Sequence, residues 1–225
     1  MPIYNAPILK IDAAETRRYA GLKKAQNFDE KNISDACEDA LLLLDVRGVW
    51  KIYDYDCANR IVKSEPQFEI IGASIIKHLA GCEKVACIAV TVGENIENEV
   101  SRRFTLGNYV SSVLLDAAAT AAVEQAADSL EKVIAREVSK DSYKMRWRFS
   151  PGYGDWQLDN QEKFFEITGA REIGMSLSAA FMLIPRKSVT AIIGLEKVIS
   201  EKCLVVSDKI KSCAMCDKLN CPSRF

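Results

Sequence analysis

The spacing of apolar residues alternates between helical and strand periods along the chain, with no low-complexity segment between them. A continuous apolar run, Lys84 to Val92, predicts a strand that is covered on both faces. The alanine-rich stretch at roughly 109–138 predicts the longest helix. Further strands are predicted at 49–55, 143–149 and 188–195, and further helices at 12–26, 34–44 (capped by Ser34), 66–79, 94–103 and from Gln161 onward.

These elements interleave without the regular spacing of βαβ units, so the predicted class is α+β. The sequence shows no internal repeat and no break in composition, which favours one compact domain. Within it we distinguish an N-terminal α/β part at 1–80, a core at 81–200 and a cysteine-rich tail at 201–225.

Composition narrows the possible functions. The 225 residues are 48% hydrophobic, enough for one sizeable core. Lys and Arg number 30 against 31 Asp and Glu, which argues against non-specific binding of nucleic acid, since that needs a surplus of cations. A multi-histidine metal site is excluded within one chain, because His78 is the only histidine. Its place near a predicted helix end favours a structural role.

Nothing in the sequence suggests export or membrane insertion. The first residues lack the basic and apolar regions of a secretory signal, and no apolar run approaches the roughly 20 residues that a membrane helix needs. We therefore expect a cytoplasmic protein whose eight cysteines are thiols or metal ligands rather than disulfides.

The segment Arg146–Trp156 joins a predicted strand to a turn. On a regular strand, Arg146 and Arg148 would point to the same face, and the Pro151-Gly152 pair that follows favours a tight turn. One interpretation is a small-molecule site in which arginine holds a carboxylate and an aromatic ring covers the ligand. The other is an ordinary turn after an edge strand with solvated arginines.

The long helix carries polar residues on one face among many alanines. Asp116, Thr120 and Glu124 follow one another at intervals of four residues. The carboxylates could meet an amine or a sulfonium while the alanines allow close approach of a ligand. Alternatively, alanine is simply a good helix former and the acids face water.

The tail contains three cysteines within nine residues. Cys213, Cys216 and Cys221 have the spacing C-x2-C-x4-C, and Cys203 is a candidate fourth ligand. This spacing suits an iron–sulfur cluster or structural zinc. The remaining cysteines stand in apolar surroundings, which favours small core residues: Cys37, Cys57, Cys82 and Cys87.

Two motifs resemble the activation (reactivation) domain of cobalamin-dependent methionine synthase. Arg148-Phe149-Ser150-Pro151-Gly152-Tyr153 matches the family's Arg-x-x-Pro-Gly-Tyr signature, and Leu177–Thr190 is similar to its Leu-Thr-x-Ser-x-x-Met-x-Pro-x-x-Ser-Val-Ser stretch. The resemblance extends from about Lys84 onward. It implies a single domain with a bent, largely antiparallel sheet flanked by helices.

The resemblance also implies ligands and site residues. The family binds S-adenosylmethionine, whose methyl group, together with an electron from a flavodoxin- or ferredoxin-like donor, restores methylcobalamin after accidental oxidation. Carried over by motif, Arg148 would hold the ligand's carboxylate. The other implied contacts with S-adenosylmethionine are Ser150, Gly152, Tyr153, Glu124 and Asp116. The implied corrinoid-facing residues are Tyr153, Trp156 and Ser188.

The chain also departs from the large synthases. It has Gly154-Asp155-Trp156 where they continue Pro-Ala-Cys-Pro, and Ile192 and Ile193 where they place an aromatic pair. Both changes resemble stand-alone relatives of anaerobic microbes, which tend to carry a cysteine-rich tail. Because the sequence holds no homocysteine, folate or cobalamin module, it would act on a separate corrinoid protein, or on a methionine synthase that lacks its own activation domain.

Two functions therefore stay open at this stage. The first is a stand-alone S-adenosylmethionine-binding reactivation protein, and the sequence leaves open whether the isolated chain catalyses methyl transfer. The second is a non-catalytic docking module for a corrinoid protein, since a retained fold does not guarantee a retained function. An unrelated methyltransferase is disfavoured, because the glycine-rich strand-to-helix loop of doubly wound folds is missing.

Overall fold

The computed structural model describes residues 3–5, 7–25 and 27–198, and the elements below belong to this part of the chain. The helices are α1 Ala13–Tyr19, α2 Glu30–Leu43, α3 Ala73–His78, α4 Asn95–Thr105, α5 Tyr109–Ser139 and α6 Asn160–Thr168, with a 3-10 helix at Ala170–Ile173. The strands are β1 Arg47–Asp56, β2 Ile61–Val62, β3 Phe68–Glu69, β4 Lys84–Thr91, β5 Tyr143–Phe149, β6 Ser176–Leu177, β7 Leu183–Ile184 and β8 Ser188–Lys197. The cysteines proposed as metal ligands in the tail lie outside the described residues.

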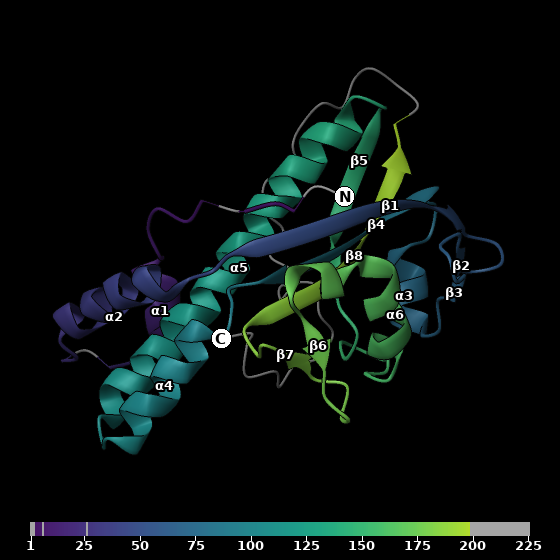
Figure 1. Cartoon of the computed structure of the whole chain (residues 1–225). Helices are drawn as coiled ribbons and strands as arrows, with labels where there is room; N and C mark the ends of the chain where they lie inside the picture. Colours follow the sequence, from purple (N-terminus) through teal and green to yellow (C-terminus); the bar gives the residue numbers. More distant parts are fainter. Residues whose placement is uncertain (1–2, 6, 26, 199–225) are drawn as a thin grey trace. The chain divides into compact units, whose positions relative to one another are not determined.

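Six of these strands form one antiparallel sheet in the order β3-β2-β1-β4-β8-β5, and β6 pairs with β7 separately (Figure 1). Tyr143 of β5 lies opposite Lys197 of β8, and Tyr55 of β1 lies opposite Val62 of β2. Helices flank the sheet, so the predicted α+β class with a largely antiparallel sheet is confirmed.

The chain divides into two compact units, each built from discontinuous segments. Unit 1 comprises Met1–Val49, Val90–Leu130 and Glu172–Val189, and unit 2 comprises Trp50–Ala89, Glu131–Arg171 and Thr190–Phe225. The long elements β1, β4, α5 and β8 contribute residues to both units. The boundaries proposed at 80/81 and 200/201 stay predictions.

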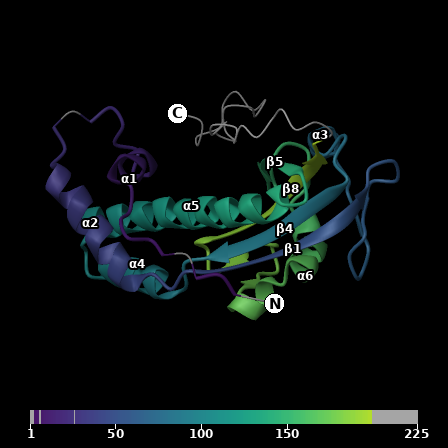
Figure 2. The same ribbon diagram turned by 90° about the horizontal axis from the view of Figure 1, so that it is seen from above.

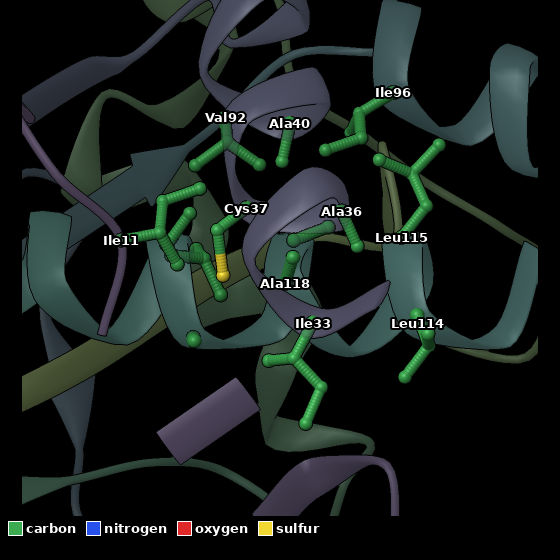
Figure 3. Close-up of a cluster of buried hydrophobic side chains, with 14 residues drawn as sticks. Ile11, Ile33, Ala36, Cys37, Ala40, Val92, Ile96, Leu114, Leu115 and Ala118 are labelled. Carbon is green, nitrogen blue, oxygen red and sulfur yellow. The ribbon is translucent and has the colours of Figure 1, made fainter. Parts of the chain in front are cut away.

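Unit 1 has a core of aliphatic side chains and alanines. Figure 3 shows side chains of α2 gathered over Leu115 and Ala118 of α5. The alanines in the first part of α5 are buried, and at 117, 118, 119, 121 and 122 they are at most 3% exposed. The alanine face therefore serves close helix packing, and α2 also contacts α4 (Figure 2).

Unit 2 has an aromatic core. Phe68, Trp156 and Phe164 are buried together with Phe149 at the end of β5, and the ring centroids of Trp156 and Phe164 are 5.4 Å apart in an edge-on arrangement. The same cluster contains Ile75 of α3, Leu79 directly after α3, and Ile167 of α6.

Two predicted helices differ from the structure. Only the last part of the helix expected at 66–79 forms, as α3, because Phe68–Glu69 pairs with β2 instead. The helix expected to be capped by Ser34 begins earlier, at Glu30. Asp29 caps it by accepting a hydrogen bond from the Lys31 N–H at 2.9 Å.

Candidate functional site

Arg148 is the penultimate residue of β5, directly before the Pro-Gly turn. β5 pairs with β8 in a register that shifts between Met145 and Arg148, so a β-bulge lies between them. Opposite the bulge, β8 carries Gly194. A Cβ added there would lie 2.6 Å from Cys82 Sγ, so a larger residue would force its neighbours to shift.

The bulge separates the two arginines that regular alternation would have placed on one face. Arg146 donates to the carbonyl oxygens of His78 and Ala80, each at 2.7 Å, and so satisfies the end of α3. Arg148 instead forms an ion pair with Glu131 of α5. The prediction of a shared face is wrong, because an extra residue in the strand reverses the alternation.

The Arg148–Glu131 ion pair is shielded from solvent, with side-chain exposures of 16% and 22%. Both residues belong to unit 2. Such an ion pair fixes the plane of the guanidinium group. The N–H donors of this group are arranged so that they match the two oxygens of a carboxylate. A ligand carboxylate would therefore be accepted beside Glu131 or in its place.

The turn after β5 is held by its own backbone. The Gly152 N–H donates to the Trp156 carbonyl at 2.8 Å, and the Tyr153 N–H donates to the Ser150 carbonyl at 3.2 Å. Gly152 has φ +89°, a conformation that favours glycine. Since the Gly152 N–H is used inside the turn, its carbonyl oxygen is the group available to a ligand. Tyr153 is 54% exposed at the tip.

Asp155 and Trp156 connect this turn to the rest of unit 2. The Asp155 carboxylate accepts from the N–H groups of Ala73 at 2.7 Å and Ser74 at 2.9 Å, and so caps α3. The hydrogen bond from the Ser74 backbone is the main cause that lowers the Asp155 pKa. These contacts give the departure from the Pro-Ala-Cys-Pro pattern a structural role.

Trp156, predicted to face a corrinoid, is instead a core side chain of unit 2. It is 1% exposed and packs among Phe68, Phe149 and Phe164. Ile192 and Ile193 are likewise fully buried. The positions at which the large synthases place an aromatic pair are therefore core positions in this chain.

In unit 1, the polar residues of α5 meet a lysine from the second motif. Lys187 Nζ lies 2.8 Å from Asp116 Oδ2 and donates to Thr120 Oγ1 at 2.9 Å. Asp116 and Thr120 thus share one face of the helix, as their spacing predicts. The role of Lys187 was missed, because its partners are far away in sequence.

The segment around Lys187 is fixed on several sides. Its backbone N–H donates to Glu97 Oε1 at 2.8 Å, and Arg186 Nε lies 3.6 Å from Glu97 Oε2. Ser188, predicted to face a corrinoid, shares a hydrogen bond of 2.9 Å with Thr91. Its hydroxyl is therefore already engaged within unit 1.

Glu124 remains a predicted ligand contact. It lies on α5 in unit 1, and its charge acts on Tyr19 of α1. Burial, and then Glu124, raises the pKa of Tyr19. The contact with a ligand amino group stays a prediction.

Within the described part of the chain, no group of three or more His, Cys, Asp or Glu side chains could hold a metal ion. Cys37, Cys82 and Cys87 are buried, as predicted for small core residues, whereas Cys57 is exposed and corrects that expectation. His78 ends α3 and is 7% exposed, which confirms its structural placement. None of the described helices has the length and hydrophobicity to cross a membrane.

One of three comparisons with known proteins bears on the fold. No protein-family model and no curated protein matches the chain. A crystal structure of the MetH reactivation domain bound to AdoHcy matches with a TM-score of 0.58 and 14% sequence identity, over 86% of this chain and 78% of the other. The chain therefore has the fold of the methionine synthase reactivation domain.

Proposed function

We propose that the chain binds S-adenosylmethionine and supports the reductive remethylation of a corrinoid held by a partner protein. One observation carries the proposal: the shielded Arg148 guanidinium stands directly before a rigid Pro151-Gly152-Tyr153 turn. The fold that this chain shares was solved with AdoHcy, the product of methyl transfer from S-adenosylmethionine. Fold and motif thus support the same ligand.

Each group in the turn has a role in this proposal. The Arg148 guanidinium binds the carboxylate of the methionine part, with Glu131 holding its orientation. The carbonyl oxygens of Ser150 and Gly152 accept hydrogen bonds from the ligand. The exposed Tyr153 ring covers the ligand on the side from which the partner approaches. The contact of Glu124 or Asp116 with the ligand's amino group, which the family resemblance implies, stays a separate prediction, since both residues belong to unit 1 and Asp116 already binds Lys187.

In this proposal these residues position the methyl donor and do not react themselves. The sulfonium of S-adenosylmethionine gives up its methyl group and keeps the electron pair of the broken carbon–sulfur bond, leaving the neutral thioether AdoHcy. A corrinoid cobalt on the partner would supply the attacking electron pair, after an electron from a flavodoxin- or ferredoxin-like carrier had reduced it. This chain holds the donor in line and limits the access of water.

Tyr153 is the corrinoid-facing candidate that best fits the structure. It is half exposed at the tip of the turn, whereas Trp156 is buried and the Ser188 hydroxyl is bonded to Thr91. An exposed aromatic ring can pack against a flat macrocycle. We expect Tyr153→Ala to weaken association with the corrinoid protein more than it alters the stability of the fold.

Calorimetric titration with S-adenosylmethionine tests the proposal. Arg148→Ala should weaken binding by roughly 10- to 100-fold, the effect of losing a hydrogen-bonded ion pair. Lys144→Ala, on the same strand and exposed, is the matched control and should bind as the wild type does. Unchanged affinity in Arg148→Ala would refute the site.

A second pair of variants separates ligand binding from folding. Gly152→Ala places a side chain at φ +89° and should reduce affinity, because the strained turn shifts its carbonyl groups. Gly81→Ala has a similar φ of +79° outside the turn and open space around its added Cβ. Both variants should lose stability through the positive φ, and Gly152→Ala somewhat more because its Cβ lies 3.3 Å from Leu158 Cδ1, but only Gly152→Ala should lose ligand.

The docking-module alternative is supported by a specific observation. Two groups assigned to the ligand already have partners inside the protein: the Arg148 guanidinium binds Glu131, and the Ser150 carbonyl accepts a hydrogen bond from the Tyr153 N–H. A docking module would bind a corrinoid protein without any saturable titration by S-adenosylmethionine. A pull-down with a purified corrinoid protein, with and without the ligand, distinguishes the two functions.

Metal binding by the cysteine-rich tail is a second part of the proposal and is tested separately. Cys213, Cys216 and Cys221, with Cys203 as the fourth ligand, would bind an iron–sulfur cluster or zinc. A cluster would allow the chain to pass the electron itself. Metal and sulfide analysis of anaerobically purified protein, wild type against Cys213→Ser/Cys216→Ser, decides this point.

A further inference from the structure

Among the residues that the structure describes, unit 1 exposes an apolar surface. It lies where α4 ends and α5 begins, and we call it the hairpin patch. Its members are large hydrophobic residues with exposed fractions of 52–61%: Phe104, Leu106, Tyr109, Val110 and Val113. Exposed hydrophobic residues on a protein surface are usually scattered singly. A contiguous group of them is more typical of an interaction surface.

The hairpin patch is ordered by local geometry. Tyr109, Val110 and Val113 lie on the first turns of α5, and Val113 follows Tyr109 at the i, i+4 spacing of one helical face, while Leu106 is the C-cap residue of α4. The rings of Phe104 and Tyr109 meet edge-on with centroids 4.9 Å apart, which ties the end of α4 to the start of α5. A partner would therefore meet a preformed surface.

A hollow of about 450 Å³ opens beside this patch, bounded by α2, the end of α4 and the start of α5. Asn32, Asp35 and Asp39 form its α2 wall, while Tyr109 and Val110 belong to both the hollow and the patch. Figures 1 and 2 both draw α2 and α4 next to each other on this side of unit 1. The hollow has room for a few side chains of a partner.

The charges around the patch are mixed rather than of one sign. Arg103 crosses the hollow and binds Asp39 at 2.9 Å and Glu99 at 2.8 Å, and Arg102 also binds Glu99. Asp35 adds an exposed carboxylate on the α2 wall. A surface that carries both positive and negative charges does not repel a copy of itself. A strongly charged partner would find no excess of the opposite charge on this surface.

We propose that the hairpin patch is the interface of a symmetric dimer with a second copy of this chain. The five side chains expose roughly 500 Å² of apolar surface, more than half of the roughly 800 Å² per partner in a standard interface. In a two-fold arrangement each copy supplies both the projecting α4–α5 end and the hollow that receives it. The rest of the area would come from the walls of the hollow.

Analytical ultracentrifugation of the full chain tests the dimer. The wild type should sediment as a dimer at tens of micromolar, and Val110→Glu/Val113→Glu should associate at least about 30-fold more weakly. Both positions are exposed near the start of α5, where a carboxylate is favourable, so circular dichroism should stay unchanged. Phe104→Glu is the second variant, placed on α4 instead of α5.

Leu9→Glu is the matched control, since Leu9 is 90% exposed and lies outside the hairpin patch. It should leave the dimer intact. A wild type that remains monomeric at 100 µM, or a Val110→Glu/Val113→Glu variant that dimerises as the wild type does, would overturn the proposal. The first result would leave a different protein as the occupant of the patch. Because the patch shares no residue with the Arg148 turn, the outcome is independent of S-adenosylmethionine binding.

Discussion

His78 should make the stability of this protein sensitive to mild acid. Its ring is 7% exposed, with its centroid 4.0 Å from that of Trp147 and 5.5 Å from that of Phe149. Burial is the largest cause that lowers the His78 pKa, from 6.5 to about 4, and the nearby Arg146 charge acts in the same direction. The hydrogen bond between Nε2 and the Trp147 carbonyl, at 2.8 Å, opposes the shift but does not cancel it.

The sign and size of the effect follow from linkage. The unfolded chain takes up the proton near pH 6.5, whereas the folded chain resists it until about pH 4. The contribution of neutral His78 is therefore complete above pH 6.5 and is lost as the pH falls towards 4. The difference between these two pKa values corresponds to about 3 kcal/mol, and about 2 kcal/mol of this is lost by pH 5.

Urea unfolding between pH 7.5 and 5 measures this loss. His78→Gln is the reference variant, because an amide can donate to the Trp147 carbonyl but does not titrate in this range. We expect the free energy of unfolding of the wild type to fall by about 2 kcal/mol more than that of His78→Gln over this interval. Parallel pH profiles for the two proteins would refute the assignment of a buried neutral imidazole.

Three further predictions concern contacts that join distant parts of the sequence. Lys187→Met and Asp116→Asn should each destabilise unit 1, with a coupling energy of about 1 kcal/mol in a double-mutant cycle, since the Asp116 carboxylate is partly exposed. Additive effects would mean that the ion pair contributes nothing. Gly194→Ala should lower the free energy of unfolding by roughly 1–3 kcal/mol, because the added methyl group overpacks the space beside Cys82. Urea unfolding of Gly194→Ala/Cys82→Ala should show that part of this loss is recovered. No recovery would mean that the clash is not with Cys82. Asp155→Ala should lower the melting temperature more than Asp155→Asn does, because the amide keeps one oxygen for the end of α3; equal losses would contradict the capping role.

Local chemistry determined a large part of this structure. The continuous apolar run of β4 and the alanine-rich α5 lie within a few residues of their predicted bounds. Both signals depend on the spacing of neighbouring side chains, which is a property of the sequence itself. The turn after β5 was equally predictable, because Pro151 restricts its own φ and Gly152 adopts the positive φ that this turn requires. The motif that placed Arg148 before this turn also indicated the fold that the comparison bears out.

Only the tertiary structure decided which side chains meet. Asp155 caps a helix 82 residues earlier in the chain, and Lys187 binds Thr120 across 67 residues. Because of a bulge in β5, Arg146 and Arg148 contact different helices. Trp156 is buried in the core, whereas Tyr153, three residues earlier, is exposed. Periodicity fixes the face that a residue occupies only while the strand stays regular. Strand register and the packing of distant elements depend on the whole chain, and they decide which polar groups find partners.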